Sequence, residues 1–228
     1  MIQVLRNVKP QILQANAETW TTEYLRARNN YADNPTPELK KEVEKLEKKY
    51  NHDQVKDALK SMFKKKCAFC ESTITHIDYG QIEHFKPKSI YPDQCFEWNN
   101  FLLSCAICNG TGSKGNKFPL EAEGGPFINP TTEDPDDFFK FEYDNVLKLF
   151  IVYPKNRRAV TMLGIIKLNR EDLAERRTKE MFKITMVIDK IIKGDQEKLD
   201  DFLNFFSDED DYYAFIKTII QKVRSKIF

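Results

Sequence analysis

The sequence predicts a mostly α fold of the α+β class, in which a small cysteine-rich segment is inserted between helical flanks. Apolar side chains recur at helical spacing in both flanks of the 228-residue chain. Residues 67–130 instead contain two Cys-x-x-Cys pairs and six of the eight glycines. This composition predicts a loop-rich segment that is held together by a cross-link between the cysteines. We therefore divide the chain into an N-terminal helical region (1–66), a cysteine-rich core (67–130), and a β-hairpin followed by C-terminal helices (131–228).

The first flank is predicted to contain three helices. Residues 10–32 carry apolar side chains along one helical face, and a proline-rich break follows. Thr36 is placed to cap a second helix over 37–51, because Pro37 suits its first position. A third helix over 53–65 ends at a run of lysines, whose charges suit the end of the helix dipole or could touch phosphate.

The core is predicted to contain little regular structure. Weak alternation over 73–84 predicts a short β-hairpin that ends at Glu83 and His84. Residues 97–104 are expected to form a turn or short helix before the second cysteine pair. Asn109 is expected to open a helix that lies across the hairpin, and the glycines that follow should keep this helix short.

The second flank begins with a predicted hairpin. Residues 138–143 and 146–153 alternate around Asp144 and Asn145, and the pair ends at a proline. The rest of the chain is predicted to be helical, over 157–168, 170–193, 196–206 and 209–227.

Composition gives only a weak indication of a partner. The formal net charge is +1, although seven lysines against five acidic residues between 64 and 118 could leave a basic face near the core. The N-terminus lacks the apolar run of a secretory signal, and no stretch has the roughly 18 apolar residues of a membrane span. We therefore expect a cytoplasmic protein without a membrane partner, where paired cysteines bind metal rather than form disulfides.

The four paired cysteines predict a zinc site. Cys67 and Cys70 are separated by 34 residues from Cys105 and Cys108. Four thiolates suit tetrahedral Zn²⁺ and leave no open position, so this zinc should be structural. The alternative is four unrelated buried thiols. Cys95 lies outside the pairs and is expected to be a spare thiol.

A second predicted site lies between the cysteine pairs. His84 has an unperturbed pKa near neutrality, which suits a general base, and Glu83 can hold a hard divalent cation, Mg²⁺ or Mn²⁺, through oxygen. Asn109 follows Cys108 directly and offers an amide oxygen as a second ligand. Asn100 is expected to hold loop backbone beside His84, or else to be an ordinary turn residue.

Three lysines near this site are predicted to bind nucleic acid. Lys86 and Lys88 follow His84, and Lys114 follows the second cysteine pair. Such side chains neutralise phosphate in a sequence-independent manner. Solvated loop charges are the alternative for Lys86 and Lys88.

The order of these residues resembles the HNH endonucleases, or ββα-metal nucleases. That resemblance implies a two-stranded hairpin packed on a helix around one catalytic metal, and hydrolysis of phosphodiester bonds. It implies His84 as general base, Asn100 as the loop-orienting residue, and Asn109 and Glu83 as metal ligands. Glu83 stands where the family more often has Asp or His. Lys114 lies two residues further from Asn109 than the family spacing.

Further motifs in the chain are IEHFKPKS, WNN-x-LLSCAICN, KGNKFPL, GGPFINP-TTEDP and LNR. Together they resemble the PtuB-type HNH nucleases of bacterial anti-phage systems, including retron-associated effectors. This resemblance spans roughly residues 52–180 and implies an ABC-type ATPase partner of the PtuA kind. DNA is the expected substrate, with RNA as the other candidate. A non-catalytic zinc-containing nucleic-acid-binding module, or an adaptor that only forms an ATPase interface, stays open as an alternative.

Overall fold

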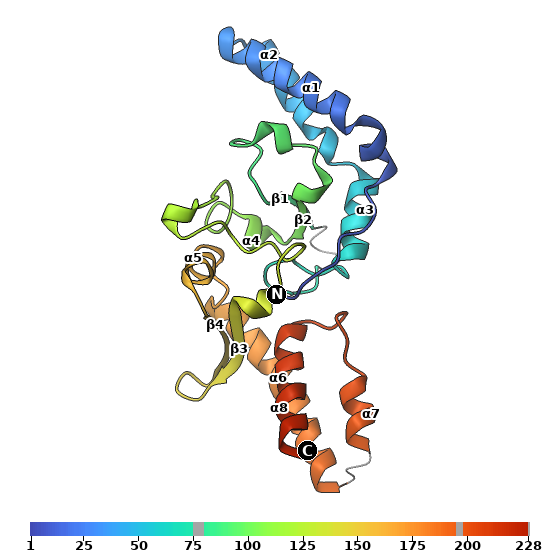
Figure 1. Ribbon diagram of the computed structural model, residues 1–228, viewed down its shortest axis with the longest axis vertical. Coiled ribbons are helices and arrows are strands. Elements are labelled where there is room, and N and C mark those ends of the chain that lie inside the picture. Colours follow the sequence, from blue (N-terminus) through green and yellow to red (C-terminus); the bar gives the residue numbers. More distant parts are fainter. Residues whose placement is uncertain (75–79, 195–197, 228) are drawn as a thin grey trace. The chain divides into compact units, whose positions relative to one another are not determined.

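The computed structural model describes residues 1–74, 80–194 and 198–227 (Figure 1). It confirms a predominantly helical α+β protein with two antiparallel two-stranded sheets among the described residues. The helices are α1 (Gln11–Asp33), α2 (Pro37–Glu47), α3 (Asp53–Met62), α4 (Ala106–Asn109), α5 (Arg157–Ile166), α6 (Glu171–Gly194), α7 (Lys198–Asn204) and α8 (Tyr213–Ile227). The strands are β1 (Gln81–His84), β2 (Phe101–Ser104), β3 (Phe139–Asp144) and β4 (Leu149–Pro154).

The chain divides into two compact units. The site unit contains Val4–Cys67 and Ile74–Phe118, and the C-terminal unit contains Met1–Gln3, Ala68–Thr73 and Pro119–Phe228. This partition groups the segments differently from the three-part division of the sequence, which stays a prediction.

The helices of the site unit begin where the sequence predicts. Thr36 caps α2 by accepting a hydrogen bond from the backbone N–H of Leu39 at 3.3 Å, and Pro37 occupies the first turn. A 3₁₀ turn over Lys48–Tyr50 continues from α2 and shares the predicted 37–51 segment. His52 caps α3, its ring nitrogen accepting from the N–H of Gln54 at 3.2 Å. The buried side of α1 consists of Leu13, Ala17, Tyr24 and Ala27.

The small sheet of the site unit differs from the prediction. β1 pairs in antiparallel register with β2, so that His84 lies opposite Phe101 and Gln81 opposite Ser104. The partner of β1 is therefore residues 101–104, which the sequence assigned to a turn or helix. All four of these residues are buried, so they form a fully buried strand without the alternation that marks a half-buried one. Residues 75–79 of the predicted hairpin lie outside the described residues.

Helix α4 is one turn long and also differs from the prediction. Asn109 is its last residue rather than its first. The helix instead begins after Cys105, whose sulfur accepts from the N–H of Cys108 at 3.5 Å. It packs against β1 and completes a ββα arrangement with the two strands.

The C-terminal unit contains the second sheet and helices α5 to α8. β3 and β4 pair from Phe139 opposite Pro154 to Asp144 opposite Leu149, as the sequence predicts. Asn169 fixes β4 to the α5–α6 turn, because its amide accepts from the N–H of Val152 and donates to the same residue's carbonyl, both at 2.8 Å. The predicted helical stretch 196–206 contains α7, and residues 195–197 lie outside the described residues.

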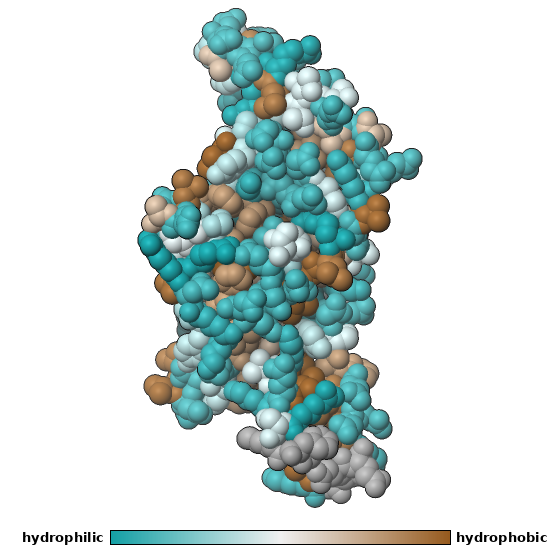
Figure 2. Space-filling model, in the orientation of Figure 1, coloured by the Kyte–Doolittle hydropathy of each residue, from teal (hydrophilic) through white to brown (hydrophobic). Residues whose placement is uncertain are grey.

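The visible surface is mainly hydrophilic. In the face drawn in Figure 2, teal residues cover most of the surface and apolar side chains are scattered among them. Within the described part of the chain, no helix combines the length and apolar character that crossing a bilayer requires.

Candidate active site and metal cluster

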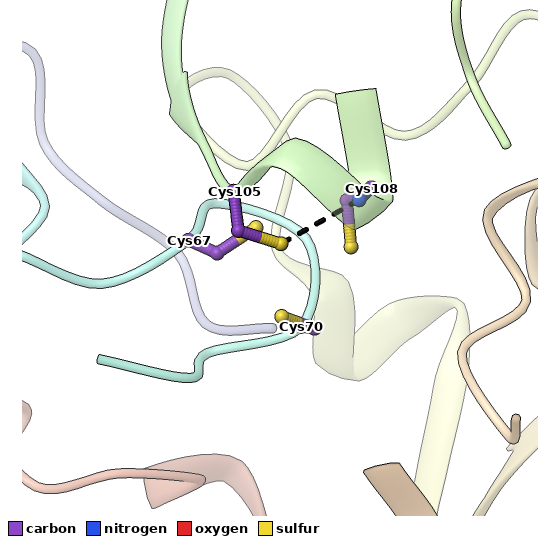
Figure 3. A group of neighbouring side chains, drawn as sticks. All are labelled: Cys67, Cys70, Cys105 and Cys108. Carbon is purple, nitrogen blue, oxygen red and sulfur yellow. Dashed lines mark hydrogen bonds between the residues drawn. The ribbon is translucent and has the colours of Figure 1, made fainter. Parts of the chain in front are cut away.

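The four predicted zinc ligands come together in space. Their sulfur atoms all lie within 4.8 Å of one another, with Cys67, Cys70 and Cys108 buried and Cys105 partly exposed. Figure 3 shows the thiol groups of the 67–70 loop pointing toward those at the start of α4. Tetrahedral zinc with bonds of about 2.3 Å separates its sulfurs by about 3.8 Å, which this cluster can meet. The cluster could therefore hold a metal such as zinc, and this donor set favours a closed, structural site.

Glu83, His84 and Asn109 line one cavity of about 230 Å³ in the site unit. Glu83 and His84 are neighbours on β1, and both are buried, with 3% and 5% of their surface exposed. They address the same cavity because His84 is the last residue of the strand. The remaining lining residues are Tyr50, Ile82, Pro87, Lys88, Thr111, Gly115 and Asn116.

The imidazole of His84 is held on three sides. Its Nε2 lies 2.9 Å from the carbonyl oxygen of Cys95. A carbonyl only accepts, so Nε2 carries the hydrogen and Nδ1 keeps the lone pair of a neutral ring. The ring also meets Tyr50 and Phe101 edge-on, with centroid distances of 4.6 and 5.0 Å.

Burial keeps His84 neutral. Desolvation lowers the pKa of His84 to about 3, and the hydrogen bond to Cys95 opposes that change in part. The side chain is therefore neutral at cellular pH, but its pKa lies well below the near-neutral value that the sequence argument used for a general base.

Lys114 lies beneath the cavity rather than at its surface. It is fully buried, forms an ion pair with Glu83, and donates to the carbonyl of His84 at 2.9 Å. The expectation that Lys114 contacts phosphate is not met by this placement. The two extra residues after Asn109 lengthen the turn, so that Lys114 folds back beneath β1. The backbone N–H of Lys114 donates a hydrogen bond to the carbonyl of Cys108 at 3.1 Å.

The environment of Glu83 suits a cation. Burial raises the pKa of Glu83 to about 7, and the Lys114 ammonium opposes that change. Oε1 of Glu83 is buried and is the carboxylate oxygen that faces the Lys114 ammonium. Carboxylate and amide oxygens are the ligands that Mg²⁺ prefers, and Asn109 lines the same cavity. The donor set therefore fits the predicted divalent cation.

Replacement of Lys114 by Met should destabilise the protein by about 3–5 kcal/mol, because it leaves a buried carboxylate without its counter-charge. The free energy of unfolding in urea measures this loss. The double variant K114M/E83Q should recover part of it, since the amide carries no charge. Equal stability of the single and double variants would contradict a buried ion pair.

Asn109 keeps an acceptor for a ligand. Its Nδ2 donates to Oε1 of Gln81 at 2.7 Å, which orients the amide. The side chain is partly exposed at the end of α4, beside the cysteine cluster that fixes that helix. Its Oδ1 is the atom that the predicted metal contact would use.

Asn100 bonds to loop backbone, as the sequence predicts. Its Oδ1 accepts from the N–H of Lys86 at 2.7 Å, and its Nδ2 donates to the carbonyls of Lys86 and Gln94 at 3.0 and 3.1 Å. The residue is buried and ties the chain after His84 to the loop that carries Cys95. It therefore positions the loop whose carbonyl holds the His84 ring.

Asn100→Ala should lower the free energy of unfolding by about 1–3 kcal/mol, because part-buried backbone groups lose their partner. Urea denaturation measures the change. Asn99→Ala is the matched control, since the neighbouring side chain is exposed. Equal stabilities of the two variants would show that the Asn100 contacts contribute little.

The two remaining lysines differ in position. Lys88 lines the cavity and is half-buried, whereas Lys86 is exposed, with its ammonium 5.7 Å from the ring centroid of Tyr91. Tyr50 is one of the cavity residues that sequence reasoning missed. Its position in the predicted 37–51 helix gives no local signal, because only the tertiary fold brings it to His84.

The fold and site define a mostly helical protein with a ββα unit beside a Cys₄ cluster. No protein-family model matches the chain. The chain is similar to Septu protein PtuB of Bacillus mycoides (strain KBAB4), with 30% identity over 171 residues that cover 64% of this chain and 57% of the relative. It is 34% identical over 119 residues to Septu protein PtuB of Bacillus thuringiensis, covering 52% of this chain and 42% of that relative. The chain thus spans about half the length of the curated relatives that it matches.

Proposed function

We propose that the protein is a metal-dependent endonuclease of the HNH type that hydrolyses phosphodiester bonds, with DNA as the first candidate substrate and RNA as the second. One observation carries this proposal. A neutral His84, fixed by the Cys95 carbonyl, lines the same cavity as the oxygen ligands Glu83 and Asn109. A module that only binds nucleic acid needs no oriented base beside hard-cation ligands.

His84 would accept a proton from water at Nδ1, since Nε2 is bound to the Cys95 carbonyl. The lowered pKa of His84 applies to the cavity without bound substrate. A phosphate anion near the ring would raise that pKa, because negative charge stabilises the imidazolium. The Cys95 carbonyl would hold the ring in place while the proton moves.

Glu83 and Asn109 would hold Mg²⁺ or Mn²⁺ through a carboxylate and an amide oxygen. When bound, such a cation polarises the phosphodiester and stabilises the leaving oxygen. Lys114 would keep Glu83 ionised, since its ammonium favours the carboxylate over the protonated acid.

We also propose a biological setting, which rests on the motifs IEHFKPKS and WNN-x-LLSCAICN and on the PtuB names of the relatives. The protein would be the nuclease of a bacterial anti-phage system, working in the cytoplasm with a PtuA-type ABC ATPase. The ATPase would decide when the nuclease cuts.

The test is incubation of supercoiled plasmid with the zinc-loaded protein and Mg²⁺ or Mn²⁺, with and without a candidate PtuA-type ATPase. Conversion to nicked or linear DNA is the expected result, and parallel reactions with RNA examine the second substrate. No cleavage under any of these conditions would leave the non-catalytic binding or adaptor role as the better description.

A further inference from the structure

One wall of the cavity carries Lys88, which the sequence predicts to bind nucleic acid, and Tyr50, which has no assigned role. Lys88 lines the cavity beside Tyr50, and its ammonium lies 5.2 Å from the centroid of the Tyr50 ring. The same ring contacts His84 edge-on, with a centroid distance of 4.6 Å. The Lys88 cation therefore lies beside a phenol ring that itself contacts the proposed base.

The Lys88 ammonium already forms an ion pair with a carboxylate. Glu47, the last residue of α2, lies 3.5 Å from the Lys88 ammonium through its Oε1. Its other oxygen accepts from the Tyr24 hydroxyl at 3.0 Å, and Arg28 donates to that hydroxyl at 3.2 Å. Glu47 is thus held by α1 independently of Lys88.

The ion pair is one that a substrate can exchange. Both side chains are part-exposed, at 27% for Lys88 and 31% for Glu47. Burial lowers the pKa of Lys88, but Tyr50 and Glu47 more than offset this and leave it raised, so the side chain stays a cation. Partly exposed pairs are weaker than buried ones, so a phosphate can replace the carboxylate on the same ammonium.

We propose that Lys88 and the Tyr50 hydroxyl form a subsite for a nucleic-acid phosphate beside His84, and that Glu47 occupies Lys88 until a phosphate displaces it. This inference rests on the proposed nuclease function and adds to it an internal competitor from the N-terminal helices. A strand in the subsite would place its neighbouring phosphodiester near His84. Glu47 then weakens the binding of a nucleic-acid phosphate to Lys88. It also disfavours anions that make only short-lived contacts with the cavity.

The test measures binding of a fluorescent DNA duplex to the zinc-loaded full chain without added divalent cation. Fluorescence anisotropy at several salt concentrations gives the binding constant. Lys88→Gln should weaken binding and lower the slope of log K against log salt by about one, since one phosphate contact is lost. Glu47→Gln should tighten binding by roughly two- to fivefold, because it removes the competitor yet keeps an acceptor for Tyr24.

Glu23→Gln is the matched control. Glu23 pairs with Lys49 at 2.7 Å in the same helical region, so its replacement changes the net charge equally without touching the cavity. The tightening by E47Q should exceed that by E23Q and should vanish in the E47Q/K88Q double variant. Equal effects of E47Q and E23Q, persistence of the effect without Lys88, or no duplex binding at all would overturn the inference.

A plasmid assay with Mg²⁺ separates this inference from the proposed function. Cleavage by the wild type with no response of binding to E47Q rejects only the competitor. Duplex binding that follows the predicted order, without any cleavage, rejects the nuclease and keeps the subsite.

Discussion

His84→Ala should lower the rate of metal-dependent cleavage by about 10²- to 10⁴-fold, the usual contribution of a positioned general base. The remaining rate would come from substrate binding and the metal ion. The measurement is the single-turnover rate of plasmid nicking at saturating Mg²⁺, with zinc content determined for each preparation. The loss should occur with zinc retained, because His84 belongs to the cavity and not to the cysteine cluster.

His52→Asn is the control for removal of an imidazole. His52 caps α3 through its ring nitrogen, and asparagine caps helices equally well. This variant should cleave at the wild-type rate. An unchanged rate in His84→Ala would rule out His84 as the base and would require another proton acceptor.

Cys108→Ser should remove most of the zinc from the protein and destabilise the site unit. Structural zinc binds folded peptides with about 10–16 kcal/mol at neutral pH, so loss of one thiolate removes a large part of the folding free energy. For a chain of this size each kcal/mol corresponds to about 2–4 °C, so the thermal midpoint should fall by at least about 10 °C. A chelator should have the same effect on the wild type. Elemental analysis should give about one zinc per wild-type chain, since four thiolates complete one tetrahedral site.

Cys95→Ala is the matched control for thiol chemistry. Cys95 is fully buried outside the cluster, and desolvation raises the pKa of its thiol to about 12, so it stays protonated. The variant should keep its zinc. Loss of zinc from Cys95→Ala, or full retention by Cys108→Ser, would contradict a site built from the four paired cysteines.

Sequence reasoning succeeded where local signals are strong. The capped helix at Thr36, the hairpin around Asp144 and Asn145, and the convergence of the four cysteines all follow from local propensity or from ligand chemistry. The backbone hydrogen bonds of Asn100 also match the expectation, because a buried amide near a loop has backbone as its natural partner.

The remaining features depend on tertiary contacts. Strand β2 was missed because Phe101–Ser104 is buried on both faces and shows no alternation. The burial of Lys114 was missed because it depends on the path of the turn after Asn109. Tyr50 was missed because apolar side chains at helical spacing do not indicate that one of them reaches a cavity. This cavity is lined by His84, which lies 34 residues further along the chain.

The position of Tyr50 has a consequence for protein engineering. A fragment cut at residue 67 would retain every cysteine ligand together with His84, Glu83 and Asn109, yet its cavity would be open on the side where the phenol ring now stands. Transplanting this segment onto another scaffold would therefore require the peptide around residues 47–50 as well, or a substitute aromatic group to keep the imidazole from rotating into solvent.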